Sequence, residues 1–121
     1  MKIAVYGTLK RGHHNNVILM NAQFLEERVI PGFKLLDSGF PVAMPCDKSS
    51  IKVEIFDIGD DEITLMRLDR LEAEGRMYIR TKIDDFQMYV GNPPYWQHPM
   101  EEIQQSDGVY EYHPYRRYAW E

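Results

Sequence analysis

The chain has 121 residues, a typical length for one domain that buries a core without needing disulfides or metal ions. A hydrophobic fraction of 44% excludes intrinsic disorder, and a net charge of −5 argues against nucleic-acid binding, which needs a concentrated cationic surface. Cys46 is the only cysteine, no apolar run is long enough to span a bilayer, and the first residues lack the layout of a signal peptide. We therefore expect a cytoplasmic protein that binds neither nucleic acid nor a membrane.

The first predicted strand, residues 2–6, ends in a loop bracketed by Gly7 and Gly12. Glycine permits backbone conformations that are closed to other residues and allows a ligand to approach the main chain. A strand that ends in such a loop offers free N–H groups, which suit a carboxylate or a developing oxyanion. The residues of the loop alone are equally compatible with an ordinary turn between a strand and a helix.

The next segments predict short elements. Residues 14–22 indicate a short helix, and residues 24–30 indicate a strand that Pro31-Gly32 ends. Residues 33–36 and 41–44 indicate two extended pieces separated by a turn.

The clearest strand and the clearest helix follow each other. In residues 51–58 isoleucine and valine alternate with lysine and glutamate, which is typical of a half-buried strand. Residues 61–72 predict a helix, because acidic residues at its start complement the free N–H groups there, and Gly75 is expected to stop it. The expected apolar face of this helix comprises Ile63, Leu65, Met66, Leu68 and Leu71.

Residues 77–83 and 86–90 predict a hairpin, joined by a turn at Asp84-Asp85. Strands outnumber helices, and several are connected by short turns. We therefore expect an α+β fold with a mostly antiparallel, curved sheet.

The character of the chain changes after Gly91. Five of the eight tyrosines and both tryptophans lie between Tyr95 and Glu121. We expect a single domain over residues 1–121 with an aromatic-rich C-terminal extension from about residue 93. Its rings either pack back over the sheet or form a lid or an interface.

A second motif stands at the end of the predicted helix. Asp69 and Glu72 are three residues apart, so both side chains project from one side of the helix. Glu72 lies in the last turn, where the negative end of the helix dipole disfavours an anion, and this predicts a raised pKa. On spacing alone, a solvated helix glutamate is the alternative.

Three segments occur in a distinctive order: YGTLKRG at residues 6–12, FPVAMP at residues 40–45, and Leu68-Asp69-x-x-Glu72 with Tyr78-x-Arg80. This pattern resembles the γ-glutamylcyclotransferase-like superfamily, in particular its γ-glutamylamine cyclotransferase and AIG2-like branch, over roughly residues 1–90. The resemblance implies a small mixed, mostly antiparallel β-barrel with flanking helices and a cavity beside the first strand.

The resemblance also implies a reaction on a small γ-glutamyl amine or γ-glutamyl amino acid. The α-amine of the substrate attacks its own γ-carbonyl, which releases an amine and closes 5-oxoproline. An amine with a pKa near 8 is mostly protonated at neutral pH, so a base must take its proton. The resemblance implies that this base is Glu72 and that no metal or cofactor is needed. The substrate-binding residues that it implies are Tyr6, Gly7, Thr8, Leu9 and Tyr78.

Two alternatives stay open at this point. Glu74 keeps the Glu-Gly dipeptide of the family, although the spacing from Asp69 and to Tyr78 favours Glu72. A non-catalytic binding or regulatory module is the second alternative, motivated by Ala73 in place of the family glycine and by Val53, which would narrow the cavity. A Glu72 that points into an open pocket beside the glycine loop favours the enzyme, whereas a pocket filled by tail aromatics favours the binding module.

Overall fold

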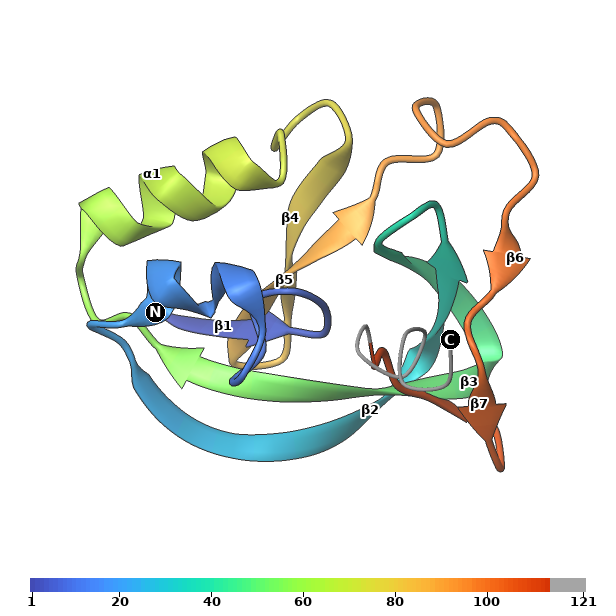
Figure 1. Ribbon diagram of the computed structural model, residues 1–121, viewed down its shortest axis with the longest axis horizontal. Coiled ribbons are helices and arrows are strands. Elements are labelled where there is room, and N and C mark those ends of the chain that lie inside the picture. The colour runs from blue at the N-terminus through green and yellow to red at the C-terminus, as the bar shows by residue number, and fades with distance from the viewer. Residues whose placement is uncertain (114–121) are drawn as a thin grey trace.

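The computed structural model describes residues 1–113. The mixed α+β fold that the sequence predicts is confirmed, with a β-sheet and few helices (Figure 1). Within the described residues, no helix is long and apolar enough to cross a membrane. The elements are β1 (Lys2–Val5), the 3₁₀ helix η1 (His14–Leu19), β2 (Gln23–Asp37), β3 (Pro41–Asp57), α1 (Glu62–Leu71), β4 (Tyr78–Ile83), β5 (Phe86–Gly91), β6 (Glu101–Glu102), β7 (Gln105–Ser106) and β8 (Val109–Tyr110).

The sheet places β1 at its centre. The strand order is β4-β5-β1-β3-β2-β6, so β1 lies between β5, to which it is parallel, and β3, to which it is antiparallel. Most other pairs are antiparallel, as expected. This order is open among the described strands, and closure into a barrel stays a prediction. The loop that follows β1 therefore starts from the middle of the sheet.

The four extended pieces expected between residues 24 and 58 are in fact two long strands. Pro31-Gly32 does not end β2, because the chain passes this point with a register shift between Pro31 and Phe33. Gly32 has a φ of 93°, which lets the bulge form without breaking the pairing with β3. The prediction of a stop at this dipeptide was wrong.

The helices are shorter than expected. Helix α1 begins at the predicted place, where the Asp61 side chain accepts hydrogen bonds from the N–H groups of Ile63 and Thr64. It ends at Leu71, before the expected stop at Gly75, and Ala73 already has a positive φ of 47°. The segment expected as a helix over residues 14–22 is a 3₁₀ helix that ends at Leu19.

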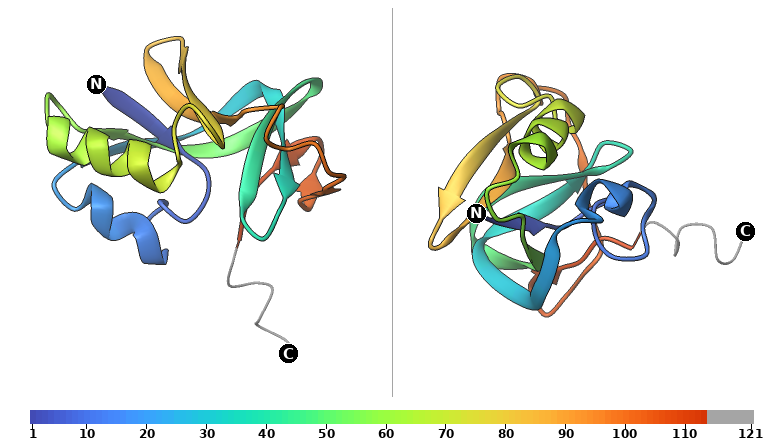
Figure 2. Two further views of the ribbon diagram at one scale, coloured as in Figure 1. Left: turned by 90° about the horizontal axis from the view of Figure 1, so that it is seen from above. Right: turned by 90° about the vertical axis from the view of Figure 1, so that its left-hand side faces the viewer.

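The expected apolar face of α1 is largely wrong. Leu68 is fully buried, but Ile63 and Met66 are 61% and 51% exposed. The helix touches the rest of the protein through a narrow stripe. Helix α1 and η1 lie side by side at one end of the long β2–β3 pair, and β6 to β8 lie at the other end (Figure 1, Figure 2).

The core occupies both faces of the central strand. Ile3 and Val5 of β1 pack in the cluster that contains Leu68, whereas Ala4 packs in the cluster that contains Ile51 and the inner side of the long strands. Of the aromatic residues in the C-terminal segment, Trp96, Tyr110 and Tyr112 are buried in the core clusters, which agrees with the first of the two expected arrangements for these three rings. Tyr115, Tyr118 and Trp120 lie outside the described residues.

Candidate active site

The glycine loop owes its shape to two different properties of glycine. Gly7 lies so close to β3 that an added Cβ would stand 2.7 Å from Cγ of Pro41. Gly12 has a φ of 83°, in the left-handed region that other residues disfavour. Close packing therefore requires the first glycine, and backbone conformation requires the second.

Two hydrogen bonds from η1 hold carbonyl groups of the loop, whereas its first N–H groups are unpaired within the described residues. The N–H of Asn15 donates to the carbonyl oxygen of Thr8 at 3.0 Å, and the side chain of Asn16 donates to the carbonyl of Leu9 at 2.8 Å. Within residues 1–113, the backbone N–H groups of Gly7, Thr8 and Leu9 donate no hydrogen bond to the protein. These three N–H groups therefore keep their hydrogen-bonding capacity unused within the described protein.

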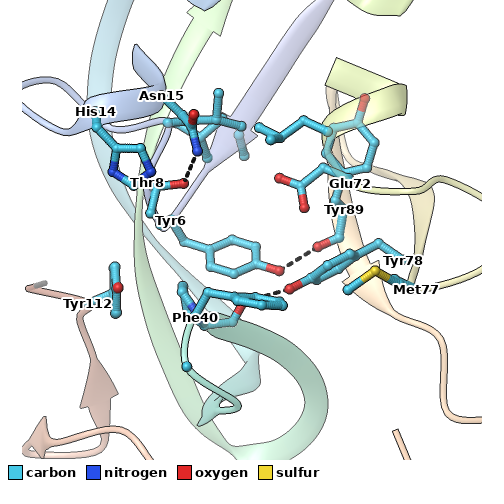
Figure 3. Close-up of a pocket in the computed structure, with 17 residues that line it drawn as sticks. Tyr6, Thr8, His14, Asn15, Phe40, Glu72, Met77, Tyr78, Tyr89 and Tyr112 are labelled. Atoms are coloured by element: carbon cyan, nitrogen blue, oxygen red, sulfur yellow. Dashed lines mark hydrogen bonds between the residues drawn. The ribbon is translucent and has the colours of Figure 1, made fainter. Parts of the chain in front are cut away.

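A cavity of about 500 Å³ lies in front of this loop (Figure 3). Its volume is within the range of about 300–1,000 Å³ that is usual for small-molecule sites. All of the predicted site residues line this cavity, namely Tyr6, Gly7, Thr8, Leu9, Glu72 and Tyr78. The structure thus brings together two motifs that are far apart in the sequence.

Glu72 is the carboxylate of this cavity. It follows the last turn of α1 as its C-cap residue, and its side chain faces the open space rather than bulk solvent (Figure 3). Within the described residues the carboxyl group has no hydrogen bond or ion pair, and burial raises its pKa to about 7. The sequence predicted the direction of this shift, but the cause is desolvation rather than the helix dipole.

Glu74 lies outside the cavity. Its side chain is exposed, and its Oε2 accepts a hydrogen bond from the backbone N–H of Arg80 at 3.1 Å. This contact ties the loop after α1 to β4. The geometry favours Glu72 over Glu74 as the group that meets a ligand.

Two tyrosines form the inner wall. The hydroxyl of Tyr6 donates to the carbonyl of Tyr89 at 2.6 Å and accepts from the N–H of Ala43 at 3.2 Å. The hydroxyl of Tyr78 donates to the carbonyl of Pro41 at 2.9 Å. Burial, with a smaller contribution from the nearby Glu72 carboxyl, raises the pKa of both phenols far above the usual value. Both tyrosines therefore stay protonated and serve as fixed walls of the cavity.

Asp69 lies outside the cavity and contacts one of the tyrosines that line it. Its Oδ1 accepts a hydrogen bond from the hydroxyl of Tyr89 at 2.6 Å and lies 3.2 Å from Nε of Arg80. Tyr89 in turn lines the cavity and accepts the hydroxyl of Tyr6 through its carbonyl. The motif residue Asp69 therefore positions an aromatic side chain rather than touching the ligand space.

Sequence reasoning missed several lining residues. Phe40 stands in the quoted FPVAMP segment, which was a usable signal, and Tyr89 follows from the hairpin register. His14 and Asn15 belong to η1 and Tyr112 follows β8, and no sequence pattern indicates that they line one cavity.

Two further residues noted in the sequence, Val53 and Cys46, lie outside the cavity lining. Val53 is fully buried in the core and does not line the cavity, so the expectation that it narrows the space was wrong. Cys46 sits beside Ser49, with 3.3 Å between Sγ and Oγ. In residues 1–113, no group of three or more His, Cys, Asp or Glu side chains is arranged to hold a metal ion.

A comparison with known protein families identifies the family of this chain. The model of the family described as gamma-glutamyl cyclotransferase, AIG2-like, matches residues 3–117. The chain belongs to this family. The gamma-glutamylcyclotransferase family protein YtfP of Escherichia coli K12 is 33% identical over 99 residues, which cover 78% of this chain and 85% of that protein. Protein PH0828 of Pyrococcus horikoshii is 36% identical over 72 residues, and the match spans only 60% of either chain.

Solved structures of γ-glutamylcyclotransferase relatives have the same fold. The solution structure of E. coli YtfP has a TM-score of 0.66 at 30% identity, and the match covers 90% of this chain and 95% of that chain. The crystal structure of a mouse AIG2-like protein has a TM-score of 0.63 at 26% identity, covering 93% and 95%. Family membership supports a cyclotransferase-like activity on a small γ-glutamyl compound.

Proposed function

We propose that this protein is a γ-glutamylcyclotransferase-type enzyme. It cleaves a small γ-glutamyl amine or γ-glutamyl amino acid by attack of the α-amine on the γ-carbonyl, giving 5-oxoproline and a free amine. One observation carries this proposal. Glu72, whose carboxyl has no partner among the described residues, lines one cavity together with Gly7, Thr8 and Leu9, whose N–H groups donate no hydrogen bond to the described protein.

Glu72 is the general base of the proposed reaction. The α-amine of the substrate is an ammonium group at neutral pH, with a pKa near 8. A carboxylate with a pKa of about 7 differs little from it, so the proton moves to Glu72 at small cost. The resulting amine nitrogen forms a bond to the γ-carbon of the same molecule. The same carboxyl then passes this proton to the leaving nitrogen as the original amide bond breaks. The extra proton that remains on the ring nitrogen follows the same route, so that the products are 5-oxoproline and a protonated amine.

The glycine loop supplies the anion contacts. Backbone N–H groups that need no reorganisation stabilise a developing oxyanion by about 3 kcal/mol per donor. The hydroxyl of Thr8 accepts the side chain of Asn15 at 2.9 Å, which leaves the hydroxyl proton to donate to the substrate. In this proposal, the loop binds the α-carboxylate and the oxygen of the γ-carbonyl.

The walls hold the substrate in a folded shape. Nucleophile and electrophile belong to one molecule, so a cavity that favours the folded conformer supplies several kcal/mol of the barrier. Tyr6 and Tyr78 fix this shape through buried hydrogen bonds to the main chain.

The openness of the cavity argues against a non-catalytic module. Tyr112 of the C-terminal segment stands in the wall, and the described aromatic side chains leave about 500 Å³ free. The long antiparallel pair of β2 and β3 supports the proposal of a small, curved, barrel-like sheet. We also propose a single domain over residues 1–121. A cytoplasmic location remains a prediction from the sequence.

A panel of γ-glutamyl compounds tests the proposed activity. Each compound is incubated with the protein, and 5-oxoproline is measured together with the released amine. We expect turnover that Glu72→Gln reduces by a factor of about 10³. Glu74→Gln is the matched control, because this residue lies outside the cavity, and its activity is expected to stay near that of the wild type. No 5-oxoproline from a broad panel would refute the function.

A further inference from the structure

The cavity extends beyond the residues that the γ-glutamyl group needs. Figure 3 shows Glu72 and Met77 on one side, His14 and Tyr112 on the opposite side, and Tyr6 between them. Phe40 stands at the rim with 39% of its surface exposed, and its ring packs edge-on against Trp96 at 5.9 Å between centroids. We call these three lining residues, His14, Phe40 and Tyr112, the distal end. Phe40 reaches the cavity from the side of Trp96, which also packs on Tyr78.

The charges of the cavity are unevenly distributed. Among the described residues that line it, Glu72 is the only carboxylate, and none is a lysine or an arginine. The nearest lysine along the loop, Lys10, is buried, with its ammonium donating to the carbonyl of Tyr112 at 3.0 Å and lying 3.9 Å from Glu111. This cation is therefore directed at the backbone behind the wall.

This distribution restricts the leaving group of the proposed reaction. A carboxylate on the leaving group would meet no lysine or arginine among the described lining residues. An ammonium group on it would meet no second carboxylate there, because Glu72 serves the α-amine. Moving a charge out of water to this partly exposed end, where it finds no partner among the described lining residues, costs free energy. An uncharged leaving group avoids this cost.

Aromatic side chains at the distal end favour an apolar body. The rings of Phe40 and Tyr112 line the same cavity and offer faces and edges against which apolar and aromatic groups pack. His14 is exposed at the same rim and adds a further flat ring. On the basis of the proposed function, we propose that the distal end is the leaving-group subsite and that it selects uncharged amines with an apolar or aromatic body over amino acids.

The position of Tyr112 is coupled to the catalytic loop. Its neighbouring strand β8 pairs with β3, where Tyr110 lies opposite Ile51. The bond from Lys10 to the carbonyl of Tyr112 then joins this segment to the loop that carries Gly7. The subsite wall and the anion-binding loop are therefore positioned as one unit.

Two matched substrate pairs test the charge selection. γ-Glutamyl-phenethylamide and γ-glutamyl-phenylalanine differ only by a carboxylate, and γ-glutamyl-pentylamide and γ-glutamyl-5-aminopentylamide differ only by a terminal ammonium. We expect kcat/KM for 5-oxoproline formation to be at least about tenfold higher for the uncharged member of each pair. Equal values within both pairs would overturn the subsite while the cyclotransferase function stands. A preference for the phenylalanine conjugate that is lost in His14→Gln would overturn it as well.

Variants of Tyr112 test the ring selection. The ratio of kcat/KM for the phenethylamide to that for γ-glutamyl-methylamide should fall about tenfold in Tyr112→Ala and recover in Tyr112→Phe. Tyr95→Ala is the matched control, because this ring packs on Trp96 outside the cavity lining and its removal should leave the ratio unchanged. An unaltered ratio in Tyr112→Ala would overturn the assignment.

Calorimetric binding separates failure of the subsite from failure of the function. The phenethylamide and the phenylalanine conjugate are titrated into Glu72→Gln, in which turnover is blocked. Tighter binding of the phenethylamide, by about tenfold, supports the subsite even if no compound yields 5-oxoproline. Equal binding overturns the subsite whether or not turnover occurs.

Discussion

The two ends of the cavity are built from different kinds of structure. The end with Glu72 and the glycine loop comes from the central strand β1 and the last turn of α1, and backbone groups provide most of its polar contacts. The distal end comes from η1, the β2–β3 turn and the C-terminal segment, and side-chain rings provide its surface. The first end is suited to one reaction on one common chemical group. The second is suited to discriminating among what is attached to that group.

Among positions other than Glu72, the largest effect is expected from the close approach at Gly7. In Gly7→Ala the added Cβ meets Cγ of Pro41 at 2.7 Å and pushes the loop donors away from the cavity. We expect kcat to fall by about 10²–10³, as for loss of an oxyanion donor, with a comparable drop for every leaving group. Gly32→Ala is the control, because it strains a positive φ outside the site, so it should lower the Tm and leave kcat near normal. Equal kcat losses in both variants would show that the loop contributes only stability.

The second effect concerns the pH dependence of stability. The pKa of Glu72 is about 7 in the folded protein and 4.5 in the unfolded reference. Its contribution to the free energy of unfolding is therefore fully present below pH 4.5 and is lost as the pH rises through 7. Glu72→Gln cannot ionise, so its free energy of unfolding does not fall in this way. Relative to the wild type, it should rise by up to about 3 kcal/mol between pH 4 and pH 8. Urea unfolding of both proteins across this range measures the difference. A difference that does not change with pH would show that the carboxyl is not buried as described.

A smaller effect is expected from the support of the catalytic wall. Asp69→Asn removes the charge that fixes the hydroxyl of Tyr89 and pairs with Arg80. We expect kcat/KM to fall about tenfold, since displaced positioning groups commonly cost this much or more. Tyr89→Phe loses the same hydrogen bond while keeping the ring and should reproduce most of the effect. Full activity in both variants would contradict a positioning role for Asp69.

The smallest effect is expected at the distal end. Lys10→Met keeps an unbranched, mostly apolar side chain one atom shorter and removes the ammonium that donates to the carbonyl of Tyr112. We expect the preference for the phenethylamide over the methylamide to fall about threefold, mainly through KM, because one hydrogen bond to a charged group is worth about 1.5 kcal/mol or more and only part of it acts on the ligand. Kinetics with these two substrates measure the change. A loss of kcat that is equal for both substrates would place Lys10 in the catalytic end instead.

The two ends also differ in how far the sequence predicts them. The strand before Gly7 and the helix before Glu72 are local patterns, so their residues could be named, and the resemblance of the two motifs to one family linked them. The pKa direction of Glu72 was predictable, but its cause was not, because burial depends on how α1 docks beside β1.

Long-range packing explains what the sequence did not predict. His14, Phe40 and Tyr112 line one cavity only because three segments that are separate in the sequence border it. Apolar spacing placed Ile63 and Met66 in the core, but the structure leaves both exposed, because only a narrow stripe of α1 around Leu68 is buried. Pro31-Gly32 is a reliable break signal in isolation, yet continued pairing with β3 converts it to a bulge.

The pH dependence of kcat/KM for 5-oxoproline formation, compared between the wild type and Glu72→Gln, tests the central claim most directly. The rate of the wild type should rise with pH to a plateau with an apparent pKa of about 7, because Glu72 must be deprotonated to accept the proton of the substrate amine. Glu72→Gln should lose both the activity and this acidic limb, whereas Glu74→Gln should keep both. An unchanged acidic limb in Glu72→Gln would contradict the assignment of Glu72 as the base.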